Sequence, residues 1–244
     1  MPRVSPNLPA ETDLLCEACG YTLNGLPPDG NCPECGKPVE FSIAPVVRQL
    51  SAWERDKDFI DTTVDVIFRP SHFFRTTTTR GESAAALRFG MIHTAIASAL
   101  FAAAGMLHTE IFSFDINPLS LFIDLFWWLL LTTCTIGALT WLARVAARLT
   151  TWEATYRGIR LPLPVVRRGL AFHAAHYLPV AIVALATTAA YQIAVHLDQN
   201  LHRMYWLIHW KIYLGVLSGE VIVGAMYLFN TYWIAMRKMM YANL

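Results

Sequence analysis

Four cysteines near the N-terminus have the spacing of a metal site. Cys16 and Cys19 form one Cys-x-x-Cys pair, Cys32 and Cys35 form a second, and twelve residues separate the two pairs. Two such pairs can present four thiolates tetrahedrally, which is the ligand set of structural Zn2+ sites. A glycine directly after each pair, and Pro33 inside the second, favour tight turns that fold backbone amides towards the sulfurs. The pattern therefore predicts a Zn2+ site at these four cysteines.

The run CEACGYTLNGLPPDGNCPECG resembles zinc ribbons and, equally, the knuckles of rubredoxin-like domains. The resemblance implies a small β zinc ribbon over residues 14–42, with a turn at Pro27-Pro28-Asp29-Gly30 between two short hairpins. Metal binding contributes about 10–16 kcal/mol to the folding of such a module, which has no core of its own. Iron in an electron-transfer role is the alternative cofactor, although this segment offers only Tyr21 and Phe41 as an aromatic shell.

The predicted ribbon is acidic. Between residues 14 and 42, four carboxylates oppose one ammonium group, namely Glu17, Asp29, Glu34 and Glu40 against Lys37. A surface of this charge repels phosphate instead of releasing its counterions, so we expect no nucleic-acid partner. A purely structural role, or contact with another membrane or cytosolic protein, is the expectation that remains.

The rest of the chain has the composition of a membrane protein. Of the 244 residues, 55% are apolar and 15% charged, against about 45–50% and about 25% in soluble proteins. Four apolar runs are long enough to cross about 30 Å of hydrocarbon; they cover about 89–107, 119–143, 177–195 and 206–233. We expect an all-α polytopic membrane bundle at 88–244, preceded by a disordered leader at 1–13 and an amphipathic, interfacial linker helix at 43–87.

Basic residues orient these four runs in the lipid bilayer. The loop at 108–118 contains no Lys or Arg, whereas six arginines lie between the second and third runs, and Arg237 and Lys238 follow the fourth. The positive-inside rule then places both termini in the cytosol. Thiolate ligands persist in a reducing compartment and favour the same side. Since residues 1–15 lack the apolar stretch of a secretory signal, the expected location is the cytoplasmic (inner) membrane.

Two segments predict helices at the membrane surface. Residues 51–68 form one amphipathic helix, in which Ser51 and Glu54 have capping-box spacing. Its apolar face consists of Ile60, Val64, Ile67 and Phe68. Residues 165–177 predict a basic interfacial helix whose arginines face anionic headgroups.

Glu220 lies near the middle of the fourth run, where a charged carboxylate costs at least about 2.5–3.5 kcal/mol. The polar side chains available to it are Thr187, Thr188, Gln192, Ser98 and Thr133. The carboxyl group either serves proton coupling, cation binding or headgroup binding, or makes one polar contact that fixes helix register. His173 and His176 share a helix face and could bind a metal, although basic interfacial positions explain them equally well.

The run DVIFRPSHFFRTTTTRGESAAALRFGMIHTAIASALFAAAG resembles the entry to bacterial Yip1-like membrane proteins, in which an amphipathic stretch with a proline-phenylalanine segment precedes an alanine-rich span. RRGLAFHAAHYLPVAIVAL is similar to that family too, although we count four spans where the family has five. The resemblance covers about residues 60–200 and implies membrane organisation or partner recruitment. Zinc-ribbon leaders of this kind also occur on bacterial membrane proteins of unassigned function.

The sequence contains no nucleophile elbow, phosphate-binding glycine loop or paired catalytic carboxylate. We therefore expect a non-enzymatic structural, interaction or membrane-organising protein that carries a cytosolic zinc ribbon. One alternative is a small transporter or channel that uses Glu220. A further alternative is a rubredoxin-like electron-transfer membrane protein.

Overall fold

The structure of the protein is a computed structural model. It describes residues 9–10, 12–43, 48–79, 83–109, 117–201 and 210–243, without the side chains of 83 and 198–201. Most of the expected leader at 1–13, most of the loop at 108–118 and the first residues of the expected fourth span, 206–209, lie outside the described residues.

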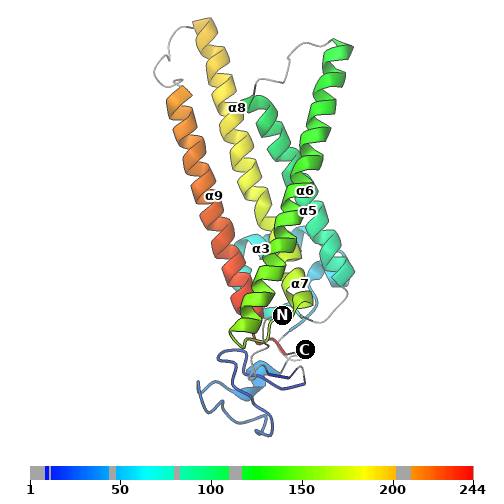
Figure 1. Ribbon diagram of the computed structural model, residues 1–244, viewed down its shortest axis with the longest axis vertical. Coiled ribbons are helices and arrows are strands. Elements are labelled where there is room, and N and C mark those ends of the chain that lie inside the picture. The colour runs from blue at the N-terminus through cyan, green and yellow to red at the C-terminus, as the bar shows by residue number, and fades with distance from the viewer. Residues whose placement is uncertain are drawn as a thin grey trace. The chain divides into compact units, whose positions relative to one another are not determined.

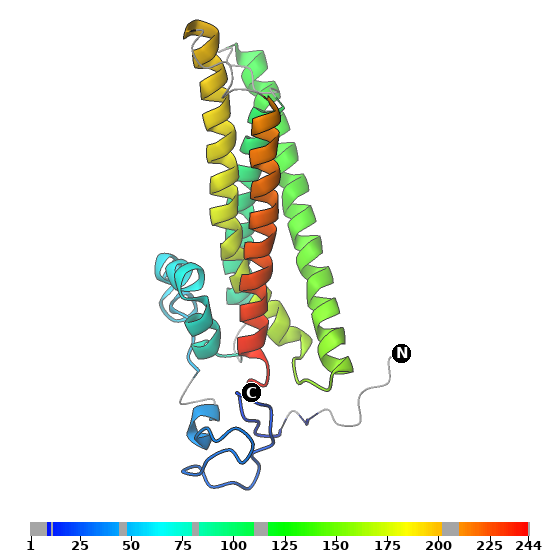
Figure 2. The ribbon, with the colours of Figure 1, turned by 90° about the vertical axis from the view of Figure 1, so that its left-hand side faces the viewer.

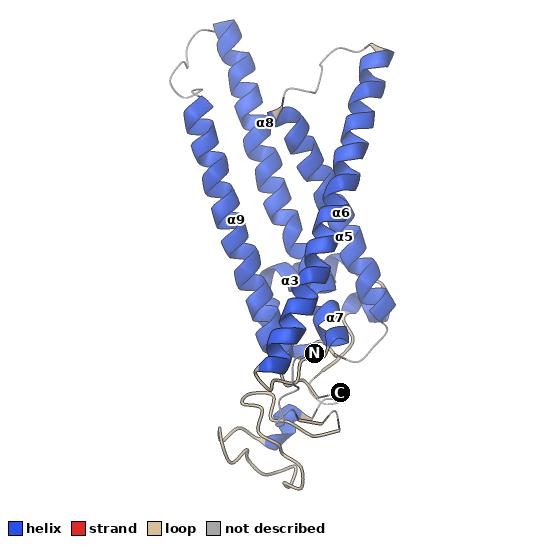
Figure 3. Ribbon diagram, viewed as in Figure 1, coloured by secondary structure: helices blue, strands red, loops and turns tan. Residues whose placement is uncertain are grey.

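All regular secondary structure in the described residues is helical (Figure 3). The elements in chain order are η1 (Val39–Ser42), α2 (Ala52–Asp56), α3 (Phe59–Phe68), α4 (Pro70–Thr76), α5 (Ser83–His108), α6 (Pro118–Tyr156), α7 (Leu163–His173), η2 (Ala174–His176), α8 (Tyr177–Leu201) and α9 (Trp210–Met239).

The predicted β ribbon at 14–42 is not shown. In the part of the chain that the structure describes, backbone pairing outside the helices amounts to isolated bridges, two of which fall in this segment, Leu15 with Thr22 and Asn31 with Pro38. Each bridge pairs the residue before a Cys-x-x-Cys turn with a residue after it. A single pair of this kind is too short to form two strands.

Within the described residues, four helices are long and apolar enough to cross a membrane (Figure 1). They cover Ala84–His108 in α5, Pro118–Tyr156 (α6), Leu163–Leu197, which joins α7, η2 and most of α8, and Trp210–Met239 (α9). Four helices of this kind agree with the number predicted from the sequence. The second helix continues beyond the expected end at 143 to Tyr156, because residues 144–157 contain neither proline nor glycine; Gly158, which follows, has a positive φ of 72°.

The chain divides into two compact units. The first comprises Met1–Met91, Leu142–Ala175 and Thr231–Leu244, and the second comprises Ile92–Trp141 and His176–Asn230. The first unit therefore contains the cysteine pairs, the short helices α2 to α4, all of α7, the start of α5 and the ends of α6 and α9.

Aromatic rings from three helices form the centre of the first unit. The ring centroid of Phe172 in α7 lies 5.0 Å from that of Phe73 in α4 and 5.3 Å from that of Phe89 in α5. Gly90 permits this close approach, because a Cβ at that position would lie 2.6 Å from the carbonyl oxygen of Ala171. Helix α7 is consequently a core element of this unit.

Burial of α7 corrects the prediction of a basic interfacial helix at 165–177. Arg167 is exposed, but the side chain of Arg168 is only 2% exposed and lies 2.5 Å from a carboxylate oxygen of Glu54, itself 4% exposed. The guanidinium also lies over the ring of Phe172. Arg168 therefore faces a buried carboxylate and an aromatic ring instead of lipid headgroups.

The predicted helix at 51–68 is two helices. The capping box of Ser51 and Glu54 is confirmed at the start of α2, but Lys57 adopts a left-handed conformation with φ of 62° and ends that helix. Asp58 then caps α3. The expected apolar face is divided, since Ile67 packs against the core whereas the remaining three residues, Ile60, Val64 and Phe68, are exposed.

Side-chain contacts join α5, α6, α8 and α9 within the second unit. Helices α8 and α9 run side by side in both views (Figures 1 and 2), and Val180 of α8 lies against Gly224 of α9. Trp128 of α6 donates to the carbonyl of Ala99 in α5 at 3.1 Å. Most large apolar side chains of α6 and α9 are exposed, as expected of helices that face hydrocarbon.

Candidate metal centre

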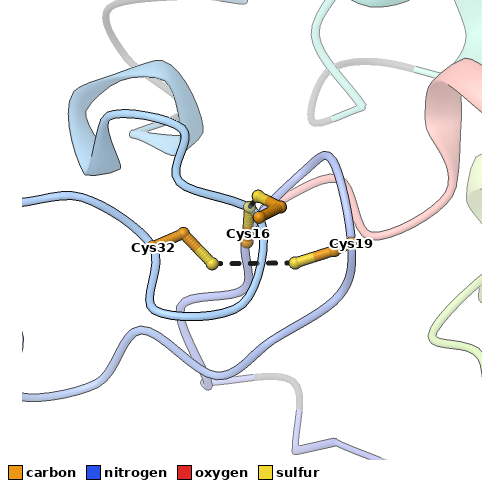
Figure 4. Close-up of side chains that lie close together, drawn as sticks. Cys16, Cys19 and Cys32 are labelled. Carbon is orange, nitrogen blue, oxygen red and sulfur yellow. Dashed lines mark hydrogen bonds between the residues drawn. The ribbon is translucent and has the colours of Figure 1, made fainter.

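The four cysteines predicted as ligands come together. Their sulfur atoms all lie within 4.8 Å of one another, and they form the one such cluster of metal-ligating side chains among the described residues. Sγ of Cys16 is 3.5 Å from Sγ of Cys35, and Sγ of Cys19 is 3.6 Å from Sγ of Cys32. Figure 4 shows the side chains of Cys19 and Cys32 pointing towards each other from separate loops.

These separations fit a tetrahedral metal ion. A Zn–S distance of about 2.3 Å places neighbouring sulfurs at a tetrahedron's corners about 3.8 Å apart. A disulfide requires about 2.05 Å, so the cysteines are free thiols at metal-site spacing. The four cysteines are therefore positioned to bind a metal ion.

Each Cys-x-x-Cys pair is held in a turn with the same hydrogen bonds, and we call these turns the first knuckle (14–23) and the second knuckle (30–39). In each, the N–H of the leading cysteine donates to the carbonyl five residues later, and the glycine N–H donates back to the leading cysteine's carbonyl. The donors and acceptors are Cys16 to Tyr21 (2.8 Å), Gly20 to Cys16 (2.8 Å), Cys32 to Lys37 (2.8 Å) and Gly36 to Cys32 (2.9 Å). Gly20 and Gly36 have positive φ values of 83° and 72°, which explains the glycine after each pair.

Backbone amides point at the sulfurs, as the sequence predicts. The N–H of Tyr21 bonds the sulfur of Cys19, and those of Glu34 and Cys35 bond the sulfur of Cys32. Burial alone would raise the pKa of the Cys32 thiol, but the two amides, together with the side chains of Cys19 and Cys35, outweigh it and lower the pKa to about 7. Burial raises the pKa of Cys19. Amides of this kind stabilise the thiolate, which is the form that binds metals.

The knuckles have a very small apolar core. Leu23 and Val39 are almost fully buried beside Cys16 and Cys32. Cys35, in contrast, is exposed. A core of this size contributes little to folding, so a metal ion bound by the four cysteines would add substantially to the stability of this segment.

The C-terminal residues of the chain contact the first knuckle, which sequence reasoning missed. The side-chain amide of Asn243 accepts from the N–H of Leu15 and donates to its carbonyl, both at 2.8 Å, and it also donates to the carbonyl of Ser42 at 2.5 Å. The ring of Tyr241 lies against Gly20, where a Cβ would meet it at 2.7 Å. Burial, then the nearby Cys19 and Glu34 charges, raise the pKa of Tyr241, so its phenol stays neutral.

Two buried arginines reinforce this contact. Arg48 makes a two-bond ion pair with Glu17 of the first knuckle, each bond 2.8 Å long, and donates to the carbonyl of Lys238 at 3.0 Å. Arg160 donates to the carbonyl of Asp13 and, at 2.9 Å, to the side chain of Asn243. No local pattern indicates these pairs, because each joins residues far apart in the sequence.

Glu220 belongs to the second unit, in α9. Its carboxylate accepts a hydrogen bond from the hydroxyl of Thr187, one of the partners expected for it. Thr188, Gln192 and Thr133, which the sequence also offered, donate instead to backbone carbonyls of Ala184, Leu107 and Leu129. The second carboxylate oxygen of Glu220 is buried and has no hydrogen bond within the described residues.

Glu220 is one of three polar residues at seven-residue intervals along α9. Tyr213 bonds His108 at 2.8 Å, and Tyr227 bonds His176 at 2.7 Å. His176 thus pairs with a phenol, and His173, in the first unit, lies 3.0 Å from the hydroxyl of Thr231. Both histidines are buried against hydroxyl groups of α9, so the structure gives no support to a metal role for them.

No family model, curated protein or solved structure matches this chain. The resemblance to Yip1-like proteins over about residues 60–200 therefore stays a prediction.

Proposed function

We propose that this protein is a non-enzymatic membrane protein in which a structural Zn2+ site at Cys16, Cys19, Cys32 and Cys35 forms a rigid cytosolic module for interaction or membrane organisation. The observation that carries this proposal is the cluster of four sulfurs within 4.8 Å, built by two matching knuckles. Four thiolates complete a tetrahedral shell and leave no position for a substrate, which is typical of structural zinc sites.

Zinc is favoured over iron by the surroundings of the sulfurs. Tyr21 and Phe41, the aromatic residues expected to shield an iron centre, are 42% and 49% exposed. A centre that exchanges electrons through a rubredoxin-like site would be better enclosed than this one. Metal analysis of the purified protein tests the assignment: zinc is expected, and a red, iron-loaded protein would favour electron transfer.

Loop charges support a cytosolic position for both termini and for the metal module. Between the second and third spans lie six arginines, and α9 ends with Arg237 and Lys238. Reporter fusions at each terminus and within the loop at 108–118 test this orientation in the inner membrane. Cytosolic signals at the termini with an external signal at the loop are expected, and a cytosolic signal from the loop would refute the orientation.

The second knuckle and the residues directly after it offer the surface for a protein partner. Cys35 of the knuckle and Phe41 just beyond it are exposed, and the acidic residues of the segment favour a basic protein surface over nucleic acid. Crosslinking from residue 37 in native membranes, with mass spectrometry, tests this role. A partner that is lost in Phe41→Ser and kept in the exposed membrane-helix variant Phe229→Ser would support it, whereas equal labelling in the two variants would contradict it.

A small transporter or channel is the second candidate function. The observation in its favour is the buried carboxylate of Glu220, of which one oxygen has no hydrogen bond within the described residues. Proton or cation flux into proteoliposomes that depends on Glu220, and is abolished in Glu220→Gln but not in Ser218→Ala, would establish it. Equal flux in wild type and Glu220→Gln would leave the Thr187 contact as the role of this residue.

A further inference from the structure

The last residues of the chain use the first knuckle as a binding surface. Asn243 pairs its side-chain amide with both backbone groups of Leu15, directly before Cys16, and Tyr241 covers Gly20, directly after Cys19. Tyr241 has a positive φ of 62°, which turns the chain back after α9 ends at Met239. We call residues 240–243 the tail.

The contact distinguishes two knuckles that otherwise have the same backbone. A Cβ on Gly20 would lie 2.7 Å from the Tyr241 ring, whereas a Cβ on Gly36 would meet no atom within 4 Å. Leu15, whose backbone pairs with Asn243, is fully buried, and its counterpart Asn31 is exposed. The tail therefore recognises the first knuckle specifically. The backbone turn that the two knuckles share does not explain this preference.

Charged groups hold the same contact from both sides. Arg48, whose side chain is 1% exposed, joins Glu17, between Cys16 and Cys19, to the carbonyl of Lys238 in the last turn of α9. Arg160 joins the carbonyl of Asp13 to the side chain of Asn243. Thus residues on both sides of Cys16 are connected to the end of α9.

Metal and tail must favour the same conformation of the first knuckle. The positions of Leu15, Glu17 and Gly20 are set by the turn that carries Cys16 and Cys19, and that turn depends on the metal because its apolar core is so small. Two ligands that stabilise one conformation bind with positive coupling, and the coupling acts equally in both directions.

Resting on the proposed zinc site, we propose that this site is a metal-dependent latch for the C-terminal end of α9. Metal binding orders the first knuckle, which then holds the tail, and loss of the metal releases it. The first binding partner of the metal site is therefore a segment of the same chain. Binding or loss of the metal changes how the end of the membrane helix α9 is held, through the contacts of Arg48 and Asn243.

Hydrogen–deuterium exchange on the full-length protein in detergent micelles, with and without a strong zinc chelator, tests the release. The latch predicts that chelation speeds exchange at residues 238–243, while residues 221–230 of α9 exchange as before. Unchanged exchange at 238–243, in a protein shown to lose its zinc, would overturn the proposal.

Zinc affinity, measured by competition with a chromogenic chelator, tests the reverse direction. We expect Asn243→Ala to lower the affinity about 5–150-fold, the usual range when the coupling between two sites is lost. Gly20→Ala should lower the zinc affinity at least about tenfold more than Gly36→Ala does. Both variants strain a positive φ, but only Gly20→Ala displaces Tyr241. Equal affinities in Asn243→Ala and wild type would refute the coupling.

The latch and the zinc site can fail separately. A wild-type protein that holds no zinc would remove the proposed function and the latch together. A protein that holds zinc, but whose affinity is the same in all tail variants, would leave the zinc site standing and remove the latch.

Discussion

The buried pair of Glu54 and Arg168 tests the assignment of α7 to the core of the first unit. The two side chains are 4% and 2% exposed and lie 2.5 Å apart. Glu54→Gln removes the negative charge but keeps the side-chain oxygen that accepts from Ser51 in the capping box. The change therefore isolates the ion pair from the helix cap.

The expected loss is large because the remaining charge stays buried. Removing one partner of a buried pair costs about 3–5 kcal/mol, and at about 2–4 °C per kcal/mol this lowers Tm by roughly 6–20 °C. Glu153 and Arg157 provide the matched control, since they form a pair of similar length, 2.6 Å, that is 55% and 60% exposed. Glu153→Gln should cost no more than about 1 kcal/mol.

Thermal unfolding in detergent, followed by circular dichroism, measures both variants. A double variant, Glu54→Gln with Arg168→Met, should recover much of the loss, because no unpaired charge is then left in the core. If Glu54→Gln lowers Tm no more than Glu153→Gln does, then Arg168 is solvated, and the interfacial helix predicted from the sequence is the better description of α7.

The remaining predictions concern the metal site and the helix contacts. Cys19→Ser should abolish stoichiometric zinc binding and make residues 12–43 sensitive to protease, whereas Cys134→Ser, which changes the exposed cysteine of α6, should do neither. Gly90→Ala should lower stability by about 1–3 kcal/mol, because its Cβ overlaps the backbone of Ala171. Gly105→Ala, whose Cβ would have no neighbour within 4 Å, should be neutral or stabilising. Thermal unfolding measures both variants. Glu220→Gln should change Tm by less than Glu220→Leu, which also loses the bond from Thr187.

Features that depend on near neighbours in the chain could be predicted from the sequence. The cysteine spacing locates the four sulfurs, the Ser51–Glu54 spacing locates the helix cap, and four apolar runs give four helices. Each of these results from turn geometry or helix periodicity within a few residues. The break at Lys57 is also local, but no glycine or proline marks it.

Features that depend on distant partners could not be predicted. Arg168 lies beside another arginine in a segment typical of a membrane surface, and its burial follows only from Glu54, 114 residues earlier. Asn243 bonds Leu15 across 228 residues. The contact of the tail with the first knuckle is therefore invisible to any pattern of spacing, although it fixes how the metal site is connected to α9.

The most direct test of the account is the metal itself. We predict that the full-length protein, purified without added metal, carries one zinc atom per chain, and that X-ray absorption shows four sulfur neighbours at about 2.3 Å. A protein that carries iron, or zinc with nitrogen or oxygen in place of sulfur, would contradict a structural zinc site at Cys16, Cys19, Cys32 and Cys35.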